Sequence, residues 1–167
     1  ILIGAPGDEF NVFNQVFFLQ GDYKFEKKLK IGSADFNKWP DLENYTSSVS
    51  DILFIDSFIL SDTGSIDVNL IPLLKVLASK SKCKLNVVLY VNHDRVNIAY
   101  ADIRTKVRQA IESVTGIRPN FTLIKVRDQR GVESYAEHDR TIFTNYIRVY
   151  SGDTFNYFKA DGSKCTK

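Results

Sequence analysis

The sequence has no methionine, one tryptophan, two cysteines and two histidines among its 167 residues. Cys83 and Cys165 do not stand at the spacing of metal ligands, so we expect reduced thiols in a cytoplasmic protein. Two histidines and two scattered cysteines do not predict a zinc site, and the sequence contains neither a P-loop nor a dinucleotide-binding glycine motif. We therefore predict no metal ion and no cofactor.

An excess of one charge and a long apolar run are also missing. The 22 basic and 20 acidic residues give a net charge of +2. This balance lacks the overall basic field of a dedicated nucleic-acid-binding protein, so any anion site has to be local. No apolar stretch is long enough for a transmembrane helix, and we expect a soluble protein.

The length of 167 residues suits one well-buried core. We predict a single domain over 1–167, with an N-terminal hairpin and loop in 1–50, an α/β core in 51–158 and a flexible tail in 159–167. The start at Ile1, with no methionine anywhere, indicates a domain excised from a longer protein.

The pattern of apolar residues predicts an α/β fold. Continuous apolar runs are typical of strands buried on both faces, whereas apolar residues three and four apart indicate helices. Alternation of strands and helices implies parallel pairing with right-handed crossovers. We predict a mixed, mostly parallel sheet flanked by helices, with antiparallel hairpins at both ends. The predicted strands are 52–60, 84–91 and 121–126, the helices are 69–80 and 102–115, and the hairpins are 10–31 and 138–151.

Polar residues interrupt this pattern at three places. Asp56 lies near the end of an apolar strand, and the trio His-Asp-Arg occurs twice, at 93–95 and 138–140. A buried carboxylate is costly unless it is paired, and ligands of α/β sheets bind beyond the carboxyl ends of the strands. Arginine beside histidine suits a phosphate. We therefore predict that Asp56, His138 and Arg140 border one site, with His93 nearby.

The C-terminal segment resembles the phospholipase D superfamily, whose motif is H-x-K, then an aspartate, then G-S-x-N. At the same spacing this chain has His138, Arg140, Asn145 and then Gly152-Asp153. The resemblance implies a phospholipase D-like fold in which the histidine attacks phosphorus and the basic residue neutralises phosphate oxygens. It extends to non-catalytic branches, such as the C-terminal domain of proteins that carry a microtubule-interacting-and-transport domain.

The departures from the motif leave three hypotheses open. Asn145 cannot supply a carboxylate that stabilises an imidazolium, and Asp153 would repel a phosphate. The first hypothesis is a non-catalytic binding or assembly module for a phosphate-bearing ligand, a lipid headgroup or nucleic acid. Its expected ligand-binding residues are His138, Arg140, His93, Arg95, Asp56 and Gly152.

The second hypothesis is an active phosphodiesterase or nuclease with His138, Arg140 and Asn145 as catalytic residues. The family mechanism uses two histidines, so a chain with one motif has to form a homodimer or use His93. The third hypothesis is that His138, Asp139 and Arg140 lock a hairpin through internal hydrogen bonds and bind nothing.

Overall fold

The structure is a computed structural model that describes residues 28–126, 140–152, 154–161 and 163. Contacts divide the chain into two compact units, 1–30 and 31–167, and the second unit is described below. The predicted hairpin over 10–31 lies outside the described residues except at 28–31, which form no strand.

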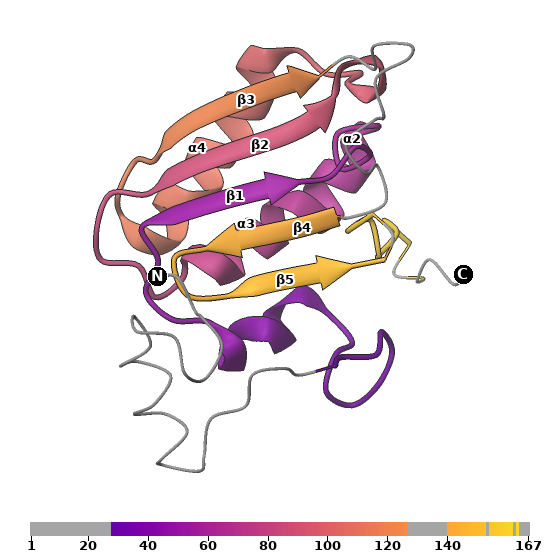
Figure 1. Ribbon diagram of the computed structural model, residues 1–167, viewed down its shortest axis with the longest axis vertical. Helices are drawn as coiled ribbons and strands as arrows, with labels where there is room; N and C mark the ends of the chain where they lie inside the picture. Colours follow the sequence, from indigo (N-terminus) through magenta and orange to yellow (C-terminus); the bar gives the residue numbers. More distant parts are fainter. Residues whose placement is uncertain (1–27, 127–139, 153, 162, 164–167) are drawn as a thin grey trace, which may run out of the picture. The chain divides into compact units, whose positions relative to one another are not determined.

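The second unit contains a five-stranded sheet in the order β3-β2-β1-β4-β5 (Figure 1). The pairs β1-β2 and β2-β3 are parallel, whereas β1-β4 and β4-β5 are antiparallel. The predicted α/β fold with a mixed sheet and a C-terminal hairpin is thus confirmed, and the sheet is parallel only in its β3-β2-β1 half. The strands are β1 Asp51–Ile55, β2 Asn86–Asn92, β3 Asn120–Val126, β4 Arg140–Thr144 and β5 Arg148–Ser151.

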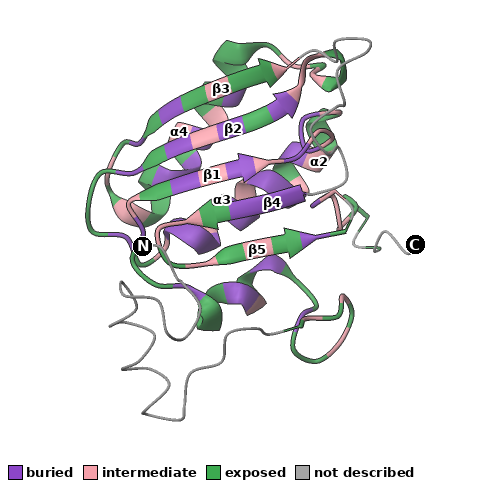
Figure 2. Cartoon of the chain, in the orientation of Figure 1, coloured by how far each residue is buried: buried purple, intermediate pink, exposed green. Residues whose placement is uncertain are grey.

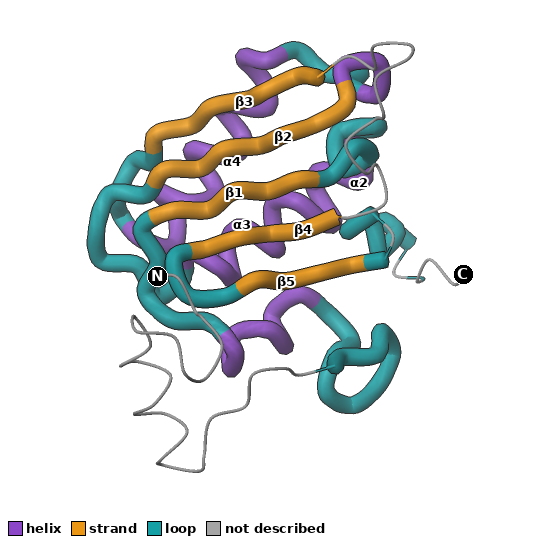
Figure 3. Tube along the Cα trace, viewed as in Figure 1, coloured by secondary structure: helices purple, strands orange, loops and turns teal. Residues whose placement is uncertain are grey.

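Helical segments connect the strands of the sheet (Figure 3), and they begin earlier than the sequence predicts. Helical turns start at Thr63, because the Asp62 carboxylate accepts a hydrogen bond from the Ser65 N–H at 2.7 Å and caps them. Asp102, the first residue of the second predicted helix, lies inside that helix, and Ala99 is the N-cap. The helical segments are η1 Trp39–Tyr45, α2 Thr63–Ser65, η2 Ile66–Leu70, α3 Ile71–Ala78, η3 His93–Arg95 and α4 Tyr100–Thr115.

Helices α3 and α4 pack on one face of the sheet and form the core with it (Figure 1). Alternate strand residues point to this face, as the period of two dictates. Each fully buried aliphatic side chain stabilises the fold by roughly 1.5–3 kcal/mol. Val114, which the helical pattern predicts on the buried face, is 39% exposed. The buried contacts come from Ile52, Phe54, Leu89 and Ile142 of the sheet and from Leu73, Leu74, Leu77, Ile103, Val107 and Ile111 of the helices.

The opposite face of the sheet keeps large side chains partly exposed (Figure 2). Tyr90, Ile124, Phe143 and Tyr150 are all exposed there. The guanidinium of Arg148 lies over the rings of both Phe143 and Tyr150, at 5.5 and 5.7 Å from their centroids. The two faces of the sheet therefore differ, with one packed on helices and one partly open.

The segment that follows β5 is tied to the core by aromatic packing. Phe155 is buried against Phe54, with ring centroids 5.3 Å apart. Trp39 is 3% exposed, and its Nε1 donates to the Asn69 side chain at 3.3 Å. Asn69 in turn donates to the Phe158 carbonyl at 2.9 Å. This packing fixes the chain directly after β5, next to the carboxyl ends of β1 and β2.

Candidate anion-binding site

The register of the sheet places Asp56 beside Arg140. Ile55 of β1 pairs with Thr141 of antiparallel β4, so the residues next to this pair, Asp56 and Arg140, meet at the carboxyl end of β1. Asp56 shares its face with the buried Phe54, and Arg140 shares that face with the buried Ile142. Two of the predicted site residues therefore converge on the edge where α/β sheets bind ligands.

Both oxygens of Asp56 accept hydrogen bonds from the surrounding loops. The carboxylate accepts from the Phe58 N–H at 2.8 Å, from the Phe155 N–H at 2.7 Å and from the Thr154 hydroxyl at 2.8 Å. These bonds join the loop after β1 to the segment after β5. Asp56 is 1% exposed, and its lone pairs serve these internal donors.

Burial raises the pKa of Asp56 above its ordinary value. The loss of hydration disfavours the charged form, and it outweighs the Phe155 and Phe58 N–H groups, the Thr154 hydroxyl and the positive charge of Arg140, which act in the opposite direction. The carboxyl thus supplies an acceptor where two loops meet, at an electrostatic cost.

Arg140 is a buried cation whose donors are incompletely used. The residue is 7% exposed, and its Nε has no hydrogen-bond partner among the described residues. Within the same residues, no ion pair or hydrogen bond joins Arg140 to Asp56. Burying a charged group with an unsatisfied donor is costly, so an anion that accepts from this guanidinium would remove an existing penalty.

A second guanidinium, that of Arg95, lies over the same Phe58 ring as the guanidinium of Arg140. Arg95, in η3 directly after β2, has its guanidinium carbon 5.0 Å from the centroid of the Phe58 ring, and the corresponding carbon of Arg140 lies 5.5 Å from it. The two guanidinium carbons are thus at most 10.5 Å apart. The aromatic ring attracts both cations, while the cations repel one another. Arg95 is exposed and Arg140 is buried, so the pair reaches from the interior to the surface.

Asn156 belongs to the same cluster, and sequence reasoning missed it. Its side-chain nitrogen donates to the Phe58 carbonyl at 2.9 Å, and its buried Oδ1 has no partner among the described residues. Asn156 and Arg140 thus place an unused acceptor and an unused donor around the Phe58 loop. The one signal in the sequence was a polar residue inside the aromatic stretch 155–158.

The other predicted residues divide between near and far positions. His93 begins η3, and its Nδ1 lies 3.1 Å from the Asp94 carboxylate. Gly152 follows Ser151, the register partner of Arg140, and a Cβ at this glycine would touch nothing within 4 Å. The backbone at Gly152 therefore does not require glycine. The predicted residues His138, Asp139 and Asp153 lie outside the described residues.

Asn145 lies at the other end of β4 from Arg140, so the structure does not bring these two predicted catalytic residues together. The Asn145 side chain accepts from the Ser50 N–H at 3.0 Å, just before β1 begins. Strand β4 runs from Arg140 to Thr144 between them, and a strand rises by roughly 3.3 Å per residue. The two residues of the catalytic hypothesis that the structure describes thus lie at opposite ends of β4.

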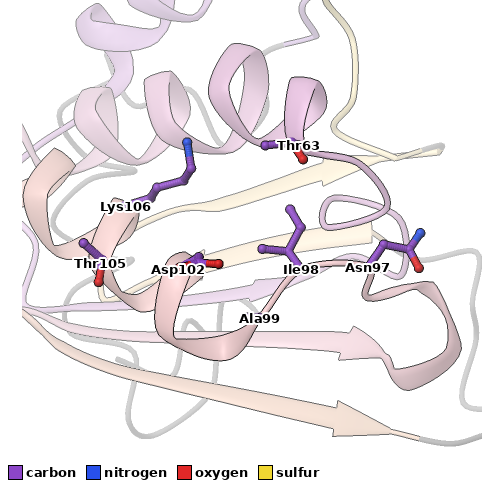
Figure 4. A pocket seen from close by; sticks show the side chains of 7 residues that line it. All are labelled: Thr63, Asn97, Ile98, Ala99, Asp102, Thr105 and Lys106. Carbon is purple, nitrogen blue, oxygen red and sulfur yellow. The ribbon is translucent and has the colours of Figure 1, made fainter.

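A separate hollow of about 420 Å³ lies among the first turns of α4, the start of α2 and the loop before α4 (Figure 4). Lys106 in its lining is paired with Asp67 at 2.7 Å, and Asn97 donates to the Ser61 carbonyl at 2.8 Å. None of the predicted site residues lines this hollow, whose lining is Thr63, Asn97, Ile98, Ala99, Asp102, Thr105 and Lys106.

A comparison with protein-family models found no match, and a comparison with curated proteins found none either. None of the helices in the described part of the chain is both long and apolar enough to cross a membrane.

Proposed function

We propose that this chain is a phospholipase D-like module that binds a phosphate-bearing ligand and does not hydrolyse it. The single observation that carries the proposal is Arg140, a buried guanidinium whose Nε has no partner among the described residues. Arg140 lies at the carboxyl end of β1, and in the sequence it stands at the position of the basic residue in the motif that the chain resembles.

The charge of Asp56 stabilises the Arg140 guanidinium, but no hydrogen bond joins the two side chains within the described residues. The carboxylate uses its oxygens on Phe58, Thr154 and Phe155, so its negative charge stabilises the guanidinium from a distance and the guanidinium donors remain for a ligand. A planar guanidinium donates two parallel hydrogen bonds to a phosphate, and such charge-assisted bonds are the strong ones.

Arg95 supplies the outer part of the proposed site. It is exposed, and it contacts the same Phe58 ring as Arg140. A ligand phosphate between the two would relieve their mutual repulsion. This chemistry suits a phosphodiester, in either a lipid headgroup or a nucleic-acid backbone.

The separation of Asn145 from Arg140 supports binding over hydrolysis. The family reaction needs a group that orients and charges the attacking imidazole, and Asn145 is held by Ser50 at the far end of β4. This chain therefore keeps the basic residue of the motif without the neighbour that the reaction requires.

The test compares Arg140→Ala with Arg148→Ala. Arg148 is a matched control, because it is an exposed arginine on β5 whose guanidinium lies over two aromatic rings on the open sheet face. Binding is measured with phosphatidylglycerol vesicles in one arm and a short single-stranded oligonucleotide in the other. The arm that binds identifies the source of the phosphate.

Arg140→Ala should weaken binding by about 1.5–3 kcal/mol, the usual worth of a hydrogen bond to a charged group, and Arg148→Ala should leave it unchanged. Circular dichroism checks that both variants are folded. Arg140→Lys, which keeps the charge and loses the fork, should bind with intermediate affinity. Equal losses in both alanine variants would indicate nonspecific attraction, and no loss in Arg140→Ala would overturn the proposal.

A further inference from the structure

The outer face of α4 carries a second, strongly basic hollow of about 350 Å³. It shares no residue with the site at Arg140. Three arginines and one glutamate are among its side chains, and the full lining is Ala101, Arg104, Thr105, Arg108, Gln109, Glu112 and Arg118.

The sequence brings the three arginines together in two ways. Arg104 and Arg108 are four residues apart on the exposed side of α4, and residues at this spacing are neighbours on a helix surface. Arg118 comes from the turn that follows Gly116, whose φ of +70° ends the helix and reverses the chain toward β3. The turn thus places Arg118 in the same hollow as Arg104 and Arg108 of α4.

The three arginines of this cluster have no hydrogen-bonded or ion-paired partner within the described residues. No hydrogen bond or ion pair there involves Arg104, Arg108 or Arg118, and the buried Nε of Arg108 has no partner. Partial loss of hydration and the charges of Arg104 and Arg118 hold the pKa of Arg108 below its ordinary value. Lys106 on the same helix, by contrast, is paired with Asp67 at 2.7 Å.

Like charges four residues apart destabilise a helix, and an unsatisfied buried donor adds a further cost. An arrangement that destabilises the free protein is stabilised when an anion binds, because only the bound state relieves both penalties. Forked guanidinium donors match tetrahedral oxyanions.

We propose that Arg104, Arg108 and Arg118 form a site for one phosphoryl group, as free phosphate or as a small phosphate monoester. The volume of the hollow suits a small ligand. The carboxylate of Glu112 in the lining opposes a run of phosphates along the groove, which favours a single phosphoryl group over a nucleic-acid backbone.

The experiment titrates the full chain with inorganic phosphate and, separately, with glycerol 3-phosphate, at constant ionic strength set with sodium chloride. Isothermal calorimetry gives the dissociation constants. Arg108→Gln and Arg118→Gln remove one cation each from the proposed site. Lys106→Gln removes one cation from the same helix outside it, and Arg140→Ala removes the cation of the site at β4.

Phosphate affinity should fall about tenfold or more in Arg108→Gln and in Arg118→Gln, and should change less than about twofold in Lys106→Gln. Tighter binding of glycerol 3-phosphate than of phosphate identifies an ester as the ligand, and the reverse identifies free phosphate. Equal affinities in wild type and both glutamine variants, or a loss confined to Arg140→Ala, would overturn the proposal. The latter result would leave the function proposed for Arg140 intact.

Both variants are expected to fold. Arg108→Gln relieves repulsion, so its urea midpoint without phosphate should be at least that of wild type. Stability that is kept while the phosphate response is lost separates a ligand-binding role from a structural one.

Discussion

Arg140 and Arg108 both have a buried Nε without a partner among the described residues, yet their neighbours are opposite in charge. Arg140 lies at the strand end beside the Asp56 carboxylate, whereas Arg108 lies on a helix surface beside Arg104 and Arg118. The Asp56 carboxylate accepts hydrogen bonds from other groups, so its charge stabilises the buried Arg140 while the Arg140 Nε–H keeps no partner among the described residues. On α4, solvent rather than a buried carboxylate stabilises the charge of Arg108, and the repulsion from Arg104 and Arg118 remains.

The difference predicts how each site binds. At Arg140 the nearby Asp56 carboxylate offsets part of the positive charge before a ligand arrives, so directional hydrogen bonds should dominate. On α4 the charge is unbalanced, so attraction between charges should dominate and salt should screen it.

The largest expected effect follows from removing Asp56. Asp56→Ala leaves two buried N–H groups and the Thr154 hydroxyl without their acceptor, and it leaves Arg140 without a nearby negative charge. We expect a loss of about 3–5 kcal/mol in the free energy of unfolding, measured by urea denaturation. A loss below about 1 kcal/mol would show that the loops around Asp56 do not depend on it. The comparable change on α4, Glu112→Ala, should cost far less, because Glu112 is exposed.

The raised pKa of Asp56 predicts a pH dependence of stability. The unfolded chain releases this proton near pH 3.8, the ordinary pKa of an aspartate, and the folded protein releases it at a higher pH because burial raises the pKa. The folded state then binds more protons in the interval, so the contribution of Asp56 to stability is greatest below 3.8 and decreases as the pH rises through the folded pKa. Above the folded pKa the decrease stops.

Urea midpoints of wild type and Asp56→Asn across the acidic range measure this contribution. The stability of wild type relative to the variant should fall with rising pH. A relative stability that rises with pH would mean that the carboxylate is favoured in the folded protein, which contradicts a cost of burial.

Salt should separate the two arginine sites. Raising sodium chloride from 0.05 to about 0.5 M shortens the screening length to a few ångströms, which weakens attraction at an exposed cluster more than at a buried group. Phosphate binding by Arg140→Ala, which keeps only the α4 site, should weaken steeply. Diester binding by Arg108→Gln, which keeps the strand-end site, should weaken less. Equal salt dependence would remove the distinction between the sites.

The smallest expected effect concerns Arg108 without ligand. Arg108→Gln should raise the urea midpoint slightly by relieving repulsion from Arg104 and Arg118. A lower midpoint would show that the guanidinium has a stabilising role that outweighs the repulsion. Lys106→Gln is the matched control, and it should lower the midpoint because it breaks the pair with Asp67.

The sequence predicted the α/β fold where periodicity is strong, and it identified Asp56 as a buried polar residue where a carboxylate stands in an apolar run. The interruption of a buried strand at Asp56 is such a signal, because a carboxylate there requires donors. Phe58 and Asn156 lie on loops, where no periodicity shows which residues meet, and sequence reasoning did not find them.

Asn145 shows the limit of motif spacing. Asn145 stands at the distance in sequence from Arg140 that the motif requires. The intervening residues form strand β4, so Asn145 lies at the other end of this strand from Arg140. The cap of α4 is a similar case. Asp102 has the right chemistry for a cap, but the chain stays extended only up to Ala99 and turns helical at Tyr100, so the carboxylate falls in the first turn.

The central claim is that the Nε–H of Arg140 is kept for a phosphate, and nuclear magnetic resonance of the arginine Nε–H groups tests it directly. Dimethyl phosphate, the simplest diester, is titrated into protein labelled with nitrogen-15, and Arg140→Lys identifies the Arg140 signal by its loss. We predict that the Arg140 Nε–H signal shifts on saturation and exchanges more slowly with water, while the Arg148 signal stays in place. An Arg140 signal that remains unchanged at ligand concentrations that shift other arginines would contradict the claim.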